Sequence, residues 1–135
     1  LCAGAAVRRM STRHGGKGGA IVNLTSAAAK LGGPGAYADY AASKGAIDTF
    51  TVGLASEVAG EGVRVNGVRP GIIDTEFHAM GGDPDRAAKL APSIPMGRAG
   101  TADEVAEAIL WLLSDQAGYV TGTTIAVTGG RAIMP

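Results

Sequence analysis

Residues 20–26 read AIVNLTS, a run of mostly apolar and β-branched side chains. Its length and composition predict a strand buried in a sheet. After a Gly/Pro-rich link, the segment from about residue 36 to residue 59 carries apolar side chains at helical spacing. A second β-branched run at 63–68 is closed by Pro70-Gly71. The order strand, helix, strand predicts two parallel strands joined by a crossover helix.

The flanking segments extend this pattern in both directions. Residues 1–13 resemble the end of a helix that is stopped by glycines. Thr101 and Glu104 form a capping-box pattern that predicts a helix start, and residues 123–128 predict a third strand. We therefore expect a single α/β domain over residues 1–135, built as an incomplete Rossmann-like parallel sheet. The stripe of the long helix that we expect to face this sheet consists of Ile47, Phe50, Leu54 and Val58.

Composition narrows the class of protein. Of the 135 residues, 46% are hydrophobic and 18% are charged, and there is no apolar run long enough to cross a bilayer. Twelve lysines and arginines balance twelve acidic residues, so no basic excess favours nucleic acid as a partner. The one cysteine, Cys2, has no partner for a disulfide within the chain, which fits a reducing compartment. We expect a cytoplasmic protein that binds neither membranes nor nucleic acid.

Three polar side chains are predicted to meet at one edge of the sheet. Ligands of open parallel sheets bind beyond the carboxyl ends of the strands. Ser26 follows the first strand there, and the first turns of the long helix bring Tyr40 and Lys44 to the same edge. Because Tyr40 and Lys44 are four residues apart, they share one helix face, and a nearby ammonium favours the phenolate. Tyr40 could then exchange a proton near neutral pH; the alternative is a packed tyrosine beside a solvated lysine.

Four ordered blocks of sequence carry a family resemblance. They are IVNLTS at 21–26, YAASK at 40–44, VRVNGVRPG at 63–71 continuing to Thr75, and the closing pairs Thr121-Gly122 and Gly129-Gly130. The chain resembles the C-terminal half of the short-chain dehydrogenase/reductase family, especially its glucose-dehydrogenase-like and ketoacyl-reductase-like members. The resemblance implies an NAD- or NADP-dependent oxidoreductase that acts on a small alcohol or carbonyl substrate.

The resemblance also implies roles for individual residues. Ser26 would hold the substrate oxygen, Tyr40 would be the catalytic acid/base, and Lys44 would contact the nicotinamide ribose. Tyr40 and Lys44 thus also count as cofactor-binding residues, together with Pro70, Gly71, Ile73 and Thr75. A homodimer or homotetramer is implied as well, and Gly45 and Gly53 within the long helix are consistent with close helix contact between subunits.

The family's glycine-rich phosphate loop belongs to an N-terminal half, which we expect to lie upstream of Leu1. The glycines between 15 and 19 do not replace that loop, because they precede a strand instead of following one. An alternative is therefore a truncated chain that is inactive by itself and only folds or assembles. A second alternative is a family relative that uses the same tyrosine and lysine to epimerise or dehydrate nucleotide sugars.

Residues 74–98 have no clear periodicity and are rich in glycine and proline, which favours a lid-like segment. Asp74, Glu76 and His78 alternate within it, and on an extended segment they would lie on one face as metal ligands. No further ligand is evident elsewhere in the sequence. We therefore expect solvated lid residues and no metal site.

Overall fold

The computed structural model describes residues 2–132. Three parallel strands form its sheet in the order β1-β2-β3; they are β1 (Gly19–Leu24), β2 (Val63–Pro70) and β3 (Thr124–Val127). Within the described residues, the outer edge of β1 has no partner strand. Parallel neighbours require crossover connections, and the helices between the strands supply them. The predicted α/β class and incomplete Rossmann-like sheet are confirmed.

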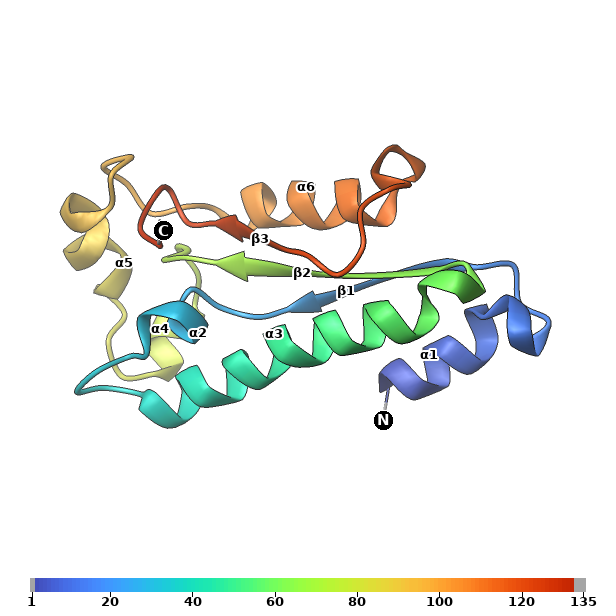
Figure 1. The fold of residues 1–135 in the computed structure, drawn as a ribbon. Helices are drawn as coiled ribbons and strands as arrows, with labels where there is room; N and C mark the ends of the chain where they lie inside the picture. The colour runs from blue at the N-terminus through green and yellow to red at the C-terminus, as the bar shows by residue number, and fades with distance from the viewer. Residues whose placement is uncertain (1, 133–135) are drawn as a thin grey trace.

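Helices cover both faces of the sheet (Figure 1). Helices α1 (Cys2–Met10) and α3 (Ala38–Val58) lie on one face, and α6 (Ala102–Leu113) lies on the other. Three short helices lie beyond the carboxyl ends of the strands, namely α2 (Ala28–Leu31), α4 (Phe77–Met80) and α5 (Arg86–Leu90). The 3₁₀ turns are η1 (Thr12–His14), η2 (Ala59–Glu61), η3 (Ala91–Ser93) and η4 (Asp115–Ala117).

The core has two layers because the side chains of β2 alternate between the two faces of the sheet. Val63 and Val65 face α3, whereas Val68 faces α6. All three side chains are fully buried, which identifies β2 as the centre of the fold. The two buried clusters comprise Ala55, Val58, Val63 and Val65 on one side, and Val68, Val105 and Leu112 on the other.

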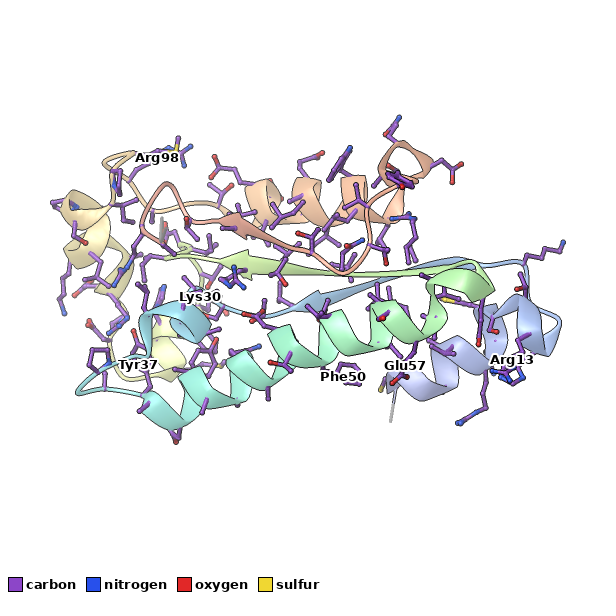
Figure 2. The ribbon with its side chains drawn as sticks, in the orientation of Figure 1. Arg13, Lys30, Tyr37, Phe50, Glu57 and Arg98 are labelled. Atoms are coloured by element: carbon purple, nitrogen blue, oxygen red, sulfur yellow. The ribbon has the colours of Figure 1, made fainter. Side chains whose placement is uncertain are left out.

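The predicted inward stripe of α3 is wrong at one position. Phe50 is 49% exposed and lies on the outer side of the helix (Figure 2). The inward face uses smaller residues, including Ala55 and Thr51, because the helix packs close to its neighbours. A Cβ at Gly122 would lie 3.5 Å from the Ala55 Cβ. The inward face of α3 therefore lies too close to the loop at Gly122 for a phenylalanine at position 55.

The first strand ends at Leu24, so Thr25 and Ser26 follow it, as the predicted site requires. The segment without periodicity contains two short helices, α4 and α5, which the sequence did not predict. The capping box is confirmed: the Glu104 amide donates to Thr101 Oγ1 at 3.2 Å, and the Thr101 amide donates to Glu104 Oε2 at 2.8 Å. Among the helices of residues 2–132, none is both long and apolar enough to cross a membrane.

Candidate active site

The predicted site residues gather at the edge where the strands end. Ser26 follows β1, Pro70 ends β2, and Tyr40 and Lys44 lie in the first half of α3. In Figure 1 this edge is on the left, where α2, α4 and α5 also lie. Chain direction accounts for this placement, because parallel strands end on the same side of a sheet and the crossover helix begins there.

Tyr40 and Lys44 are close together, as their spacing predicts. The Lys44 Nζ lies 5.7 Å from the centre of the Tyr40 ring. The same ammonium donates a hydrogen bond of 3.0 Å to the Leu24 carbonyl at the end of β1. A lysine ammonium has three N–H donors, so two remain for other partners after this contact. The strand end thus holds a positive charge beside the tyrosine ring.

Thr25 holds the main chain of the same lysine. Its side chain is buried, and its Oγ1 donates a 3.0 Å hydrogen bond to the main-chain carbonyl of Lys44. Its amide donates to the Val68 carbonyl at 2.9 Å. Leu24 and Thr25 therefore hold Lys44 by its side chain and its backbone. Sequence reasoning gave Thr25 no role, although a hydroxyl directly after a strand was a usable signal.

Ser26 is positioned by the start of α2. Its Oγ accepts a hydrogen bond of 3.1 Å from the Ala28 amide, which leaves the hydroxyl proton available for another acceptor. Within residues 2–132, no hydrogen bond joins the side chains of Ser26, Tyr40 and Lys44 to one another. Ser26 is linked to α3 only indirectly, because the adjacent Thr25 donates a hydrogen bond to the Lys44 carbonyl.

The segment after β2 is fixed mainly by its backbone. The Pro70 carbonyl accepts from the Ala27 amide at 2.8 Å, and the Gly71 amide donates to the Val127 carbonyl at 2.9 Å. A Cβ on Gly71 would lie 2.8 Å from the Thr128 Cα, so only glycine fits there. Ile73 forms a parallel bridge with Gly100, whereas Thr75 is exposed just before α4. These contacts place the chain from Pro70 to Ile73 alongside the end of β3.

The three candidate metal ligands do not share an extended face, because helix α4 begins at Phe77. The His78 ring nitrogen Nε2 lies 2.9 Å from the Ile73 carbonyl, so the ring is engaged by the backbone. In the part of the chain that the structure describes, no group of three His, Cys, Asp or Glu residues could hold a metal ion.

A second tyrosine lies beside Tyr40. The Tyr37 ring meets the Tyr40 ring edge to face, with their centres 6.0 Å apart. Arg86, from α5, donates a hydrogen bond of 2.6 Å to the Tyr37 hydroxyl and stacks over its ring at 5.2 Å. Sequence reasoning missed this pair, because 49 residues separate its members and no local pattern links them.

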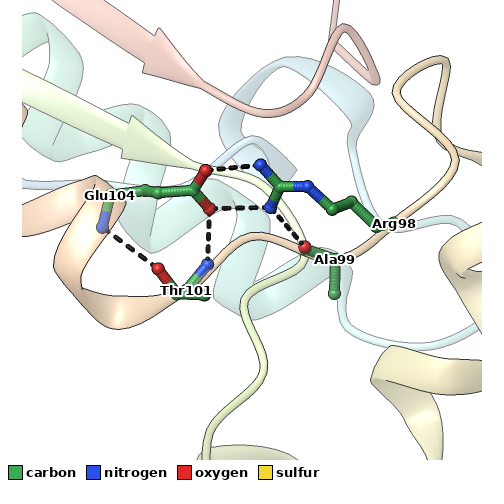
Figure 3. A network of polar contacts seen from close by, with 4 residues as sticks. All are labelled: Arg98, Ala99, Thr101 and Glu104. Carbon is green, nitrogen blue, oxygen red and sulfur yellow. Dashed lines mark hydrogen bonds and ion pairs between the residues drawn. The ribbon is translucent and has the colours of Figure 1, made fainter.

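An ion pair between Arg98 and Glu104 joins the end of the segment 74–98 to the start of α6. Arg98 makes two hydrogen bonds to the Glu104 carboxylate, at 2.6 Å and 2.9 Å (Figure 3). These bonds, together with the Thr101 amide, lower the pKa of Glu104 to about 2. A cavity of about 270 Å³ lies beside this network and extends to Ile73 and Gly129. It adjoins the segment after β2, and neither Ser26 nor Tyr40 lines it.

Comparison with known proteins agrees with this architecture. The family model described as enoyl-(acyl carrier protein) reductase matches residues 1–132. An uncharacterized oxidoreductase of Escherichia coli, YgfF, is 60% identical over 131 residues, which cover 97% of this chain and 53% of that protein. A 3β-hydroxysteroid dehydrogenase of Eggerthella lenta is 45% identical over 118 residues, covering 87% of this chain and 45% of that protein.

A solved structure shows the same arrangement of elements. The gluconate 5-dehydrogenase of Burkholderia cenocepacia, in complex with NADP and tartrate, superposes with a TM-score of 0.84 at 35% identity. The match covers 96% of this chain and 49% of that protein. The chain thus spans about half the length of the relatives that it matches. On the strength of its sheet, its matched sequence and its relatives, the chain belongs to the short-chain dehydrogenase/reductase family.

Proposed function

We propose that these residues form the catalytic half of an NAD(P)-dependent oxidoreductase that interconverts an alcohol and a ketone. The observation that carries the proposal is the Lys44 ammonium, held by the Leu24 carbonyl at 5.7 Å from the centre of the Tyr40 ring. A phenol, which can give or take a proton, and an ammonium with free N–H donors thus lie together at the edge where ligands of parallel sheets bind.

The residues at the sheet edge suit the nicotinamide end of the cofactor. Lys44 retains two N–H donors, and the exposed Thr75 hydroxyl makes no side-chain hydrogen bond within residues 2–132. These donors match ribose hydroxyls and an amide oxygen. The backbone from Pro70 to Ile73 would form the wall on the β3 side. When bound, the nicotinamide ring would supply or accept the hydride.

Each catalytic side chain then has one task. In reduction, the Tyr40 hydroxyl gives its proton to the carbonyl oxygen of the substrate, and in oxidation the phenolate takes the proton back. The Ser26 hydroxyl donates a hydrogen bond to the same oxygen while its own oxygen stays fixed by the Ala28 amide. The Lys44 ammonium lies beside Tyr40 during both reduction and oxidation.

The test uses a joined chain, in which residues 1–135 follow the portion of the E. coli relative that precedes its matched region. A panel of ketones is screened with NADPH and NADH, and Tyr40→Phe is compared on the best substrate. We expect turnover to fall by about 10² to 10⁴, as for loss of a general acid. Tyr119→Phe is the matched control, because Tyr119 is fully exposed. Near-normal turnover of Tyr40→Phe would contradict the assignment.

We also propose that the protein assembles as a homodimer or homotetramer through the outer face of α3. Phe50 on this face is 49% exposed, and Gly53, three residues further along the same side of the helix, leaves room for a close partner helix. Phe50→Asp in the joined chain should shift the mass measured by light scattering toward that of the monomer. Gln116→Glu, at an exposed position of η4 away from this face, controls for added charge. A parent chain that is already monomeric would refute the proposal.

A further inference from the structure

Arg86 is held by an aromatic side chain instead of a carboxylate. Its guanidinium carbon lies 5.2 Å from the centre of the Tyr37 ring, and its Nη2 donates to the Tyr37 hydroxyl at 2.6 Å. Within residues 2–132, no carboxylate forms an ion pair with it. A guanidinium carries five N–H donors, and the tyrosine takes one of them. The residue is thus a half-buried, oriented cation with unused donors.

Asp83, three residues before Arg86, is already paired with another cation. Asp83 contributes its backbone carbonyl to the Arg86 amide at 3.2 Å, while its carboxylate accepts from Lys89 at 2.5 Å. The hydrogen bond from Lys89 is the largest cause of the lowered pKa of Asp83, and the charge of Arg86 adds to it. Asp85 and Asp39 are exposed and form no ion pair with Arg86.

Tyr37 lies between Arg86 and Tyr40. Tyr37 contacts both residues, with its ring edge to face against Tyr40 at 6.0 Å and its hydroxyl on Arg86. A Cβ on Gly33 would lie 2.6 Å from the Tyr37 ring, so the ring is also confined from the α2 side. The lid-like segment therefore presents a fixed positive charge one aromatic ring away from the proposed proton donor.

From this geometry we infer that the substrate carries a carboxylate, which the Arg86 guanidinium binds together with the Tyr37 hydroxyl. The inference rests on the proposed function, since it names the class of alcohol or ketone that Tyr40 protonates. The Tyr37 oxygen accepts from Arg86 and can still donate its own proton to a carboxylate oxygen. Two donors side by side match the two oxygens of a carboxylate, and a planar guanidinium suits them better than an ammonium.

The experiment compares oxo acids with their methyl esters in the joined chain. Each pair has the same reacting carbonyl and differs in charge and by one methyl group. We expect the acid to have the higher kcat/KM, and Arg86→Gln to reduce the acid-to-ester ratio by about 10- to 100-fold, the value of a hydrogen bond to a charged group. The kcat/KM of the ester should stay within about twofold of the parent. Arg86→Lys should retain part of the ratio, and Tyr37→Phe should lower it by a smaller factor.

Arg8→Gln is the matched control, because it removes an exposed arginine of α1 at the opposite end of the sheet. A ratio that Arg86→Gln leaves unchanged, or a parent that favours the ester, overturns the inference. A parallel loss of acid and ester turnover overturns it as well, since this would mean that Arg86 only fastens α5 to α3.

A binding measurement separates this inference from the proposed function. Succinate is titrated into the joined chain by calorimetry, with succinamide as the neutral probe. Saturable binding of succinate that Arg86→Gln weakens at least about tenfold supports the carboxylate site even if no ketone is turned over. Turnover of the uncharged ketones with no succinate binding would support the oxidoreductase and reject the carboxylate site.

Discussion

The two ends of the sheet differ in how far their polar side chains are paired by hydrogen bonds within the chain. At the amino ends of the strands, the buried Ser11 donates to the Glu61 carboxylate at 2.5 Å, and Thr12 and Arg13 contact the same residue. At the carboxyl ends, Ser26, Lys44 and Arg86 each retain donors after their contacts within the chain. At the amino ends the buried Ser11 hydroxyl is paired with the Glu61 carboxylate, whereas the half-buried groups at the carboxyl ends keep donors for a ligand. This difference is consistent with the proposed ligand site at the carboxyl ends of the strands.

The charges at the amino ends of the strands serve the fold. Ser11 gives the largest contribution to the lowered pKa of Glu61, and Arg13 adds a further hydrogen bond. The backbone there is equally tight, since the Gly18 amide donates to the Met10 carbonyl at 2.7 Å. A closed turn of this kind connects α1 to β1 and leaves little space for a ligand.

The largest expected effect concerns the 135-residue chain produced alone. Among residues 2–132, no strand leads through a glycine-rich turn into a helix, which is the element that binds a dinucleotide pyrophosphate. We expect no dehydrogenase activity and no saturable binding in a fluorescence titration with NADPH or NADH, although Tyr40 and Lys44 are present. The joined chain is the positive control. Micromolar binding by the 135-residue chain would show that the site at the carboxyl ends suffices for the whole cofactor.

The next effect tests the site at the carboxyl ends directly. Ser26→Ala in the joined chain should lower turnover by about 100-fold, as for loss of a donor to a developing oxyanion. Affinity for NADPH should change little, because the hydroxyl addresses the substrate. Thr12→Val removes a hydroxyl at the amino ends, where it donates to the Glu61 carbonyl, and should leave turnover unchanged. Equal losses in both variants would erase the distinction between the two ends.

A third substitution tests the amino ends of the strands through stability. A Cβ at Gly16 would lie 2.3 Å from the Met10 carbonyl oxygen, so Gly16→Ala forces the turn between α1 and β1 to move. We expect a loss of about 1 to 3 kcal/mol in the free energy of unfolding, with kcat unchanged. Gly4→Ala has no atom within 4 Å of the new Cβ and serves as the control. Thermal unfolding of the joined chain measures both, and an unaffected Gly16→Ala would mean that this turn is loose.

The smallest effect concerns acid stability at the start of α6. The folded pKa of Glu104, about 2, lies below its usual value of 4.5, so the charged carboxylate stabilises the fold above about pH 4.5. This contribution is lost as the pH falls from about 4.5 toward 2. Glu104→Gln should flatten that part of the stability curve, measured by denaturant unfolding at several pH values. The effect should be small, because the pair with Arg98 is about half exposed.

Glu107→Gln is the control for this pH series, since Glu107 lies on the exposed side of the same helix and has no ion pair within residues 2–132. If both variants show the same pH dependence as the parent, the network of Figure 3 contributes nothing measurable to stability.

The features that could be predicted from the amino-acid sequence are those that depend on neighbours along the chain. The β-branched runs predicted three strands, the four-residue spacing placed Tyr40 beside Lys44, and the pattern at Thr101 predicted the helix cap. Such features are set by backbone geometry within one turn of helix or one pleat of strand, so a short window of sequence contains their cause.

Contacts between residues far apart in the sequence could not be predicted in this way. Arg86 reaches Tyr37 across 49 residues, and Thr25 reaches the Lys44 carbonyl across 19. The same holds for the inward face of α3, where the closeness of the packed chain selects Ala55 and leaves Phe50 outside. These contacts depend on the separation and angle of packed elements, which result from the whole core and leave no periodic trace in the sequence.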